Sequence, residues 1–187
     1  MKQQDIELCI FDARNFQKHG MYDEAITVLL PIIDLPQKSL FQVEALKLLS
    51  FNYRKLDDVN MAMYYIQRAL KLVISLKGKE KGVNTEYAVC LMNKGVINES
   101  RGKITNALSD YSETLGIFQG LFDIGEVDNG ILINALLTIG TACYNKNDYL
   151  SAKKYLMDAL VYFGDDCKTD RRYLAIKNTL TEIESYS

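Results

Sequence analysis

The sequence predicts an all-α fold, an array of four antiparallel helix pairs followed by one capping helix. Three observations support this prediction: a pattern of helical spacing that recurs four times, a small residue at a fixed place in each copy, and long stretches without a helix breaker. The 187 residues are 48% hydrophobic, and only two of them are proline. A chain of this size and composition can bury a sizeable core.

The four copies share one frame that starts at a turn-forming residue. They read GMYDEAITVLLPII, DDVNMAMYYIQRAL, GKITNALSDYSETL and NDYLSAKKYLMDAL, and they begin at Gly20, Asp57, Gly102 and Asn147. Successive copies are 37, 45 and 45 residues apart. Glycine, asparagine and aspartate are the residues that best tolerate a positive φ. Each first position therefore predicts a tight turn between two helices.

Small residues recur on both helices of each predicted pair. After the turn, the second helix carries an alanine, followed at helical spacing by apolar or small residues that make one face. A residue that is small in every copy indicates close approach of a neighbouring helix, where a large side chain would overpack the contact. The small residues are Ala25, Ala62, Ala107 and Ala152 on the second helices, and Ala13, Ser50, Gly95 and Gly140 on the first helices.

The end of the chain and one proline complete the predicted pattern. Residues 169–187 read as a further amphipathic helix, with Thr169 or Asp170 as its cap. Its predicted apolar positions are Leu174, Ile176, Leu180 and Ile183. Pro31 falls inside the second helix of the first pair, which it should kink or end locally.

The repeated frame resembles the tetratricopeptide repeat (TPR) family. The fourth copy fits the family pattern best, through Ile139-Gly140, Tyr149, Ala152, Leu156 and Ala159. The resemblance implies a right-handed superhelical array with a concave groove lined by the first helices, and a single TPR domain over residues 1–187. It places the helix pairs at about 5–36, 39–77, 83–123 and 129–164, and the capping helix at 168–185. Units of about 37–45 residues are similar to those of bacterial peptide-sensing regulators and of kinesin light chains.

The resemblance also implies a function, a protein–protein interaction module that acts as a scaffold or adaptor. Such a module binds a peptide or partner helix in the groove. Arginine and lysine there suit a carboxylate, amides suit a peptide backbone, and apolar residues suit side-chain pockets. The alternative is that these are ordinary solvent-facing residues of a helical array. The candidate groove residues are Arg14, Gln17, Lys47, Phe51, Arg54, Met92, Asn93, Val96, Asn134, Leu137, Thr138, Thr141 and Tyr144.

A second functional hypothesis is a bacterial-type peptide-sensing regulatory module whose output domain lies elsewhere. A homodimer is also open, because the first helix carries Ile6, Cys9, Ile10 and Phe11 on a rather apolar side. Packing of that side against the next helix is the favoured interpretation. A co-purifying short peptide would indicate a sensor, and a stable protein partner would indicate a scaffold.

The composition argues against most other classes. A single histidine, His19, has no triad or dyad partner in the sequence, so we expect no enzyme and no catalytic residues. The four cysteines form no CxxC pair and no phosphate-binding glycine loop is present, so we expect no metal and no cofactor. A net charge of −2 disfavours nucleic acid, and the lack of a long apolar run disfavours a membrane. Without a signal-peptide core, we expect the cytoplasm.

Overall fold

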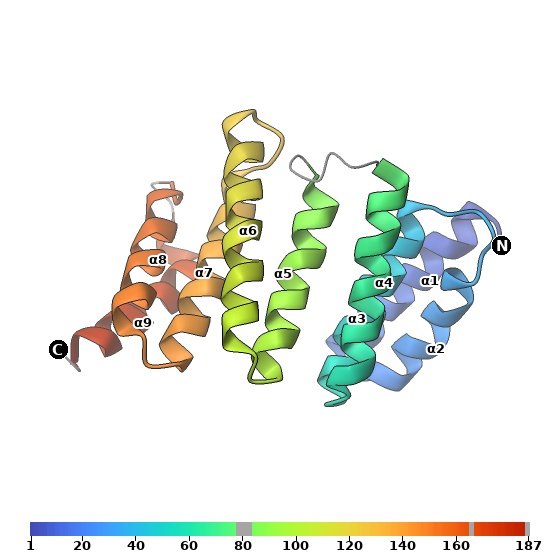
Figure 1. Ribbon diagram of the computed structural model, residues 1–187, viewed down its shortest axis with the longest axis horizontal. Helices are drawn as coiled ribbons and strands as arrows, with labels where there is room; N and C mark the ends of the chain where they lie inside the picture. The colour runs from blue at the N-terminus through green and yellow to red at the C-terminus, as the bar shows by residue number, and fades with distance from the viewer. Residues whose placement is uncertain (78–83, 165–166, 186–187) are drawn as a thin grey trace. The chain divides into compact units, whose positions relative to one another are not determined.

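The computed structural model describes residues 1–77, 84–164 and 167–185, and the all-α prediction is confirmed for them (Figure 1). The predicted start of the third pair at residue 83 lies outside the described residues. The elements are α1 (Gln3–Lys18), α2 (Tyr22–Ile33), α3 (Leu40–Lys55), α4 (Val59–Lys77), α5 (Thr85–Ser100), α6 (Ile104–Asp123), α7 (Asn129–Asn145), α8 (Tyr149–Val161), the 3-10 turn η2 (Cys167–Thr169) and α9 (Arg171–Ser185).

The chain divides into two compact units, residues 1–110 and 111–187, whose boundary lies within α6. In the first unit each helix from α1 to α4 packs on the next, and α3 also contacts both α1 and α5. In the second unit α7 packs on α8, and α9 contacts both. Contacts between alternate helices are the mark of stacked helix pairs. The single TPR domain over residues 1–187 stays a prediction.

The four predicted turns are confirmed by their backbone angles. The residue after each turn residue donates its N–H to the carbonyl five positions earlier, as Met21 does to Phe16 at 2.9 Å and Asp148 does to Cys143 at 3.0 Å. This bond defines the Schellman motif, which ends a helix on a left-handed residue. The values of φ are 73° at Gly20, 63° at Asp57, 71° at Gly102 and 60° at Asn147.

Changing Gly102 to alanine should destabilise the protein by about 1 kcal/mol, because an L side chain is strained at a φ of 71°. A Cβ at this position would meet no atom within 4 Å, so only the backbone angle opposes the change. Gly116 is the matched control, because its Cβ would also meet nothing and it lies inside α6. Gly116→Ala should stabilise by about 0.5–1 kcal/mol. Urea unfolding followed by circular dichroism measures both, and a Gly102→Ala variant as stable as the parent would contradict the turn assignment.

Contacts in the second and fourth pairs confirm the predicted close crossings there. In the second pair, the Ser50 hydroxyl donates to the carbonyl of Ala62 at 2.8 Å, which joins the two helices where they cross. In the fourth pair, a Cβ on Gly140 would lie 2.8 Å from Cγ and Cδ2 of Leu156. The crossing residues are all buried: Ala13, Ser50, Gly95 and Gly140 on the first helices, and Ala25, Ala62, Ala107 and Ala152 on the second helices.

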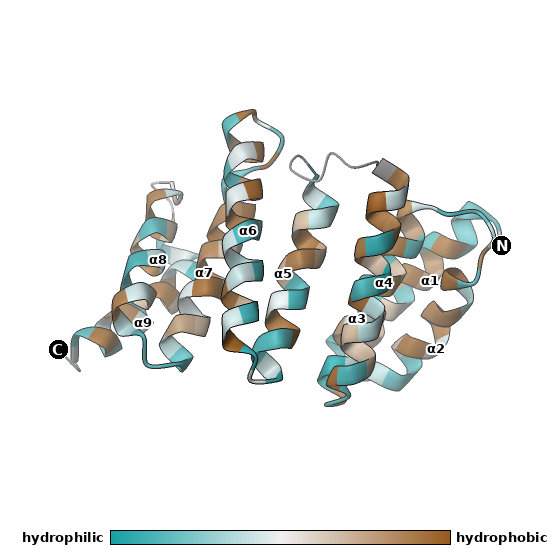
Figure 2. Ribbon diagram, viewed as in Figure 1, coloured by the Kyte–Doolittle hydropathy of each residue, from teal (hydrophilic) through white to brown (hydrophobic). Residues whose placement is uncertain are grey.

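The helices bury one face each, and bands of hydrophobic and hydrophilic residues alternate along α4 in Figure 2. The core of the first unit includes Leu29, Ile32, Leu49 and Ile66, each fully buried. No helix within the described residues combines the length and the apolar character that a membrane span requires.

Three details of α9 and α2 correct or refine the sequence prediction. Ile176, Leu180 and Ile183 are buried in α9, but Leu174 is 47% exposed, so its predicted apolar role is wrong. Leu174 lies two residues before Ile176, which places it on the opposite side of the helix. The cap of α9 is Asp170, whose carboxylate accepts the N–H of Arg172 at 2.8 Å. Pro31 lies in the last turn of α2, which ends two residues later.

Candidate functional site

A network of ion pairs links α1, α3 and α5, which are the leading (first) helices of the first three helix pairs. Glu44 and Lys47 both lie on α3. Arg14 of α1 lies 2.8 Å from one carboxylate oxygen of Glu44, and Lys47 lies 2.6 Å from the other. Lys47 also lies 2.8 Å from Glu86 of α5. The Lys47 side chain is only 12% exposed. Arg14 and Lys47, expected to hold a carboxylate of a ligand, are therefore engaged by carboxylates of the protein itself.

The ion pairs keep Glu44 and Lys47 charged at neutral pH. Burial alone would raise the pKa of Glu44, but Lys47 and Arg14 outweigh it and lower that pKa below its ordinary value of 4.5. Burial alone would lower the pKa of Lys47, but Glu44 and Glu86 raise it above its ordinary value of 10.5. The pairs therefore join α1, α3 and α5 electrostatically across the neutral range.

An open pocket of about 390 Å³ lies between α1 and α3, beside the ion pairs. Its apolar lining comes from Ile10 and Phe11 of α1 and from Leu40 and Phe41 of α3. Phe11 is 60% exposed and Leu40 is 46% exposed, so both present apolar surface to solvent. Glu7, Arg14 and Glu44 add charge to the lining. The arrangement can accept a bulky apolar side chain and orient polar groups around it.

An aromatic ring and two cations meet near the other end of α3. The ring of Phe51, 37% exposed, has Arg54 Cζ at 5.5 Å and Lys55 Nζ at 5.6 Å from its centroid. Tyr22 packs edge-on against the same ring, with centroids 6.4 Å apart. The structure thus brings together Phe51 and Arg54, two predicted groove residues, in a cation–π arrangement.

Gln17, a predicted groove residue, is half-buried and contacts another residue of the protein. Its side-chain amide donates to Oδ1 of Asn52 at 2.8 Å. Asn52 is fully buried, and its Nδ2 has no hydrogen-bond partner. The three predicted residues of α5, which are Met92, Asn93 and Val96, are half-buried. Their role toward a ligand stays a prediction.

In the second unit, α9 supplies partners to two predicted groove residues of α7. Arg172 donates to Oδ1 of Asn134 at 3.3 Å, and the Tyr144 hydroxyl donates to Glu182 at 2.8 Å. Thr138 donates to the backbone carbonyl of Asn134 at 2.8 Å. The other two predicted residues differ in exposure: Leu137 is half-buried and Thr141 is exposed. The polar groups of Asn134 and Tyr144 thus contact the protein itself.

Several residues of the site escaped sequence reasoning, namely Phe11 as an exposed lining residue, Leu40, Phe41, Glu44 and Glu86. One signal was present, because Glu44 and Lys47 lie three residues apart in a predicted helix, a spacing that pairs charges. The pairing of Glu86 with Lys47 spans 39 residues and has no local signal. Among the residues that the structure describes, no group of three or more histidine, cysteine, aspartate or glutamate side chains could hold a metal ion.

No protein-family model matches the chain, and no curated protein matches it in sequence. Solved structures resemble it clearly in fold. BtubC from P. vanneervenii gives a TM-score of 0.75 at 19% identity, over 92% of this chain and 69% of that chain. A protein from Podosopora anserina, described as a kinesin light chain with nearly identical TPR-like repeats, gives 0.74 at 12% identity, over 99% and 88%. MamA gives 0.57 at 25% identity, over 84% and 77%. Taken with the four turns and the small residues at each crossing, these likenesses establish that the chain has the TPR-like helical-repeat fold.

Proposed function

We propose that the chain is a protein-interaction scaffold that binds a peptide or a partner helix on the leading helices of its first unit. The observation that carries this proposal is the pocket between α1 and α3, where Phe11 and Leu40 expose apolar surface. An exposed apolar patch beside charged groups is typical of a surface that binds protein. The TPR-like fold supports a binding role rather than catalysis.

The pocket also suggests what the partner presents. Its volume of about 390 Å³ is near the lower limit of small-ligand sites, which suits one bulky apolar side chain. Glu7, exposed at the pocket, favours a lysine or arginine next to that anchor. We therefore expect a segment with one apolar anchor and a neighbouring basic residue. A peptide-sensing module with its output domain elsewhere would use the same binding step.

The site of action proposed here is the cytoplasm. Cys9, Cys90, Cys143 and Cys167 form no disulfide in the part of the chain that the structure describes. Burial raises the pKa of the Cys90 thiol to about 12, so it stays protonated at neutral pH. Cysteines without disulfides, one of them a buried and protonated thiol, fit a reducing compartment.

Peptides selected from a displayed library on the purified protein should lose affinity when Phe11 and Leu40 are both changed to serine. The anchor residue of the peptide loses two apolar contacts. We therefore expect the Kd measured by fluorescence polarisation to rise by about tenfold or more. Leu150→Ser is the matched control, because Leu150 is 84% exposed on α8 and should leave the Kd within about twofold.

Three outcomes would count against this site. One is equal weakening by the double variant and by Leu150→Ser, and another is a selection that enriches no peptide above background. The third is sedimentation of the parent as a dimer that the double variant converts to a monomer, because the pocket would then join two copies of the chain. Circular dichroism confirms that each variant is folded.

A further inference from the structure

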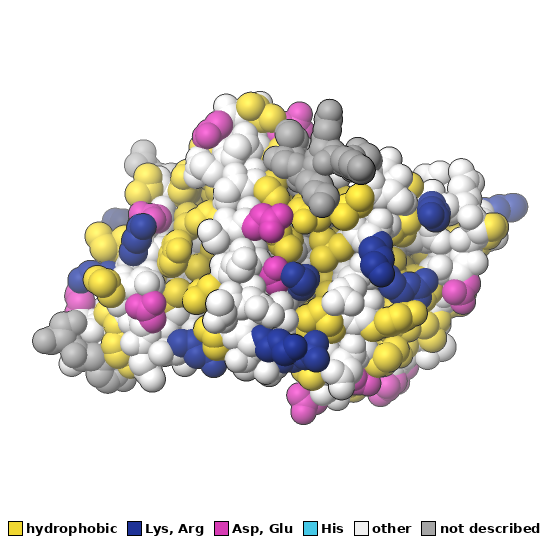
Figure 3. All heavy atoms as spheres, in the orientation of Figure 1, with side chains coloured by type: hydrophobic (Ala, Val, Ile, Leu, Met, Phe, Trp, Pro, Cys, Tyr) yellow, Lys and Arg dark blue, Asp and Glu magenta, His cyan; other side chains and the backbone are white. Residues whose placement is uncertain are grey.

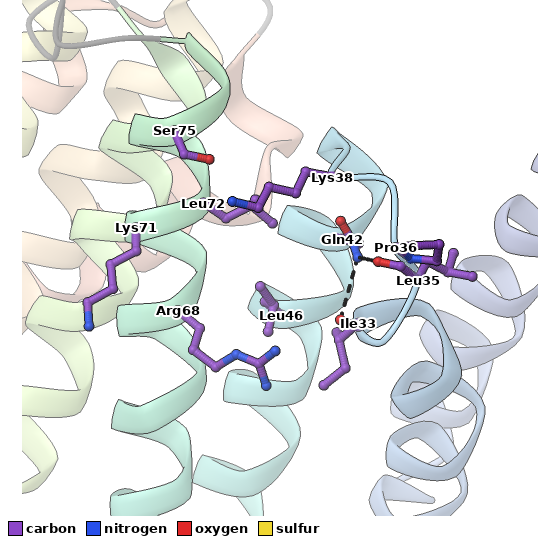
Figure 4. Close-up of a pocket in the computed structure, with 10 residues that line it drawn as sticks. All are labelled: Ile33, Leu35, Pro36, Lys38, Gln42, Leu46, Arg68, Lys71, Leu72 and Ser75. Atoms are coloured by element: carbon purple, nitrogen blue, oxygen red, sulfur yellow. Dashed lines mark hydrogen bonds between the residues drawn. The ribbon is translucent and has the colours of Figure 1, made fainter.

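We propose a second binding site in the first unit, for an acidic peptide segment that carries one bulky apolar residue. The site is a pocket of about 340 Å³ between the α2–α3 connection, α3 and α4 (Figure 4). It shares no lining residue with the pocket between α1 and α3. The proposal therefore stands or falls independently of the function proposed above.

The floor of this pocket is apolar and its wall is fixed in place. Leu35, Leu46 and Leu72 contribute the apolar surface. Gln42 is 4% exposed, and its Nε2 donates to the carbonyl of Leu35 at 2.8 Å while its Oε1 accepts the N–H of Ser39 at 3.1 Å. These bonds tie the connection to α3 before any ligand binds. Because this wall is ordered before binding, the entropic cost of binding is lower.

All the charged side chains that line this pocket are positive. Its lining includes three cations, Lys38, Arg68 and Lys71, and no aspartate or glutamate. None of the three forms an ion pair with a carboxylate among residues 1–77, 84–164 and 167–185. Lysine and arginine side chains lie over the middle of α4 in Figure 3. Because the whole chain has a net charge of −2, this local positive surplus departs from its average and favours an anionic partner.

Two of the cations lie at opposite ends of the apolar floor. In Figure 4 Lys38 reaches across the pocket toward Leu72, whereas the guanidinium of Arg68 extends toward Leu46. Arg68 is held by the Tyr64 ring, with Cζ 5.6 Å from the ring centroid, a contact that leaves its charge intact. Lys71 points away from the other two.

This geometry fits carboxylates on both sides of an apolar side chain. Arginine binds a carboxylate through two parallel hydrogen bonds, and lysine binds one as a point charge. The leucine-lined floor offers nothing to an inorganic anion, but it removes apolar surface of a leucine-sized side chain from water. An acidic peptide with one central apolar residue uses both features at once.

Titration of the ¹⁵N-labelled chain with a blocked peptide tests the proposal. The probe has one leucine flanked by two glutamates on each side, and two comparison peptides replace the leucine with serine or the glutamates with glutamine. We expect amide shifts at Lys38, Leu72 and Ser75, and about tenfold weaker binding of both comparison peptides. Lys38→Gln with Arg68→Gln should weaken binding of the probe by about tenfold. Lys146→Gln, a change of an exposed lysine on the second unit, should leave it within about twofold.

Charge reversal makes the test sharper. A variant with Lys38→Glu and Arg68→Glu should lose the acidic probe and bind a peptide with lysines in place of its glutamates. If that variant does not fold, the variant with Lys38→Gln and Arg68→Gln tests the role of the two cations instead. The proposal is overturned by an absence of shifts at about 5 mM probe, or by shifts confined to the pocket between α1 and α3. It is also overturned if inorganic phosphate or octanoate shifts the same amides with the same dependence on Lys38 and Arg68.

Discussion

Leu156→Ala should lower the free energy of unfolding of the second unit by about 2–5 kcal/mol. Leu156 is fully buried in α8, and its Cγ and Cδ2 approach the backbone of α7 at Gly140. Removal of the side chain forfeits its transfer from water and leaves a cavity that packed neighbours fill only in part. Urea unfolding followed by circular dichroism measures the loss. Met157, the next residue, is 52% exposed, so Met157→Ala should cost less than about 1 kcal/mol.

A double-mutant cycle tests the contact itself. Gly140→Ala should cost about 1–3 kcal/mol, because the new Cβ would lie 2.8 Å from Cγ and Cδ2 of the fully buried Leu156. This cost outweighs the gain of about 1 kcal/mol for alanine over glycine in a helix. In the Leu156→Ala background the obstruction is gone, so the same change should be neutral or stabilising. Additive effects of the two substitutions would show that the helices do not meet as closely as described.

Lys47→Met should destabilise the first unit by about 1–3 kcal/mol at neutral pH. The substitution keeps the apolar stem but leaves Glu44 and Glu86 without their shared cation. Loss of one partner of a fully buried pair costs about 3–5 kcal/mol, and loss of an exposed pair costs at most about 1 kcal/mol. With side chains 12%, 23% and 34% exposed for Lys47, Glu44 and Glu86, these pairs lie between the two limits.

The loss should depend on pH with a defined sign. The pKa of Glu44 is lowered in the folded protein, so its contribution is complete above its ordinary value of 4.5 and is lost as the pH falls through the folded value. The pKa of Lys47 is raised, so its contribution is complete below 10.5 and is lost as the pH rises through the folded value. The difference between the parent and Lys47→Met should therefore be largest at neutral pH and shrink in acid.

Two further variants separate this explanation from a general loss of packing. Adding Glu44→Gln to Lys47→Met should recover part of the stability, because one uncompensated charge is removed. Lys154→Met, at an exposed lysine of α8, should be close to neutral. A Lys47→Met variant whose stability matches the parent from pH 4 to pH 8 would rule out a stabilising role for the ion pairs.

The fold could be predicted from the sequence because its rules are local. A positive φ needs glycine, asparagine or aspartate, and the first residue of each copy satisfies that need at Gly20, Asp57, Gly102 and Asn147. A close crossing needs a small side chain, and the alanines fulfil that need at fixed spacing. Leu174 was predicted wrongly because four apolar residues of α9 fit a loose helical stripe, of which only Ile176, Leu180 and Ile183 face the core.

The candidate site could be predicted only in part, because its contacts are long-range. The sequence indicated that Arg14, Lys47 and Asn134 lie on leading helices. It gave no sign that Arg14 meets Glu44 across 30 residues, or that Asn134 meets Arg172 across 38. Whether a polar side chain is available to a ligand depends on such contacts, which arise only when the helix pairs stack.

The last helix has a consequence for competition between ligands. Because α9 contacts α7 through Arg172 with Asn134 and Glu182 with Tyr144, it occupies these groups from within the same chain. A tethered segment acts at an effective concentration in the millimolar range. A free partner that uses the same groups of α7 must displace α9. Its apparent affinity is therefore lower than its intrinsic affinity, in proportion to the small fraction of molecules in which α9 is detached. A shortened chain without α9 would reveal the intrinsic affinity that the tether conceals.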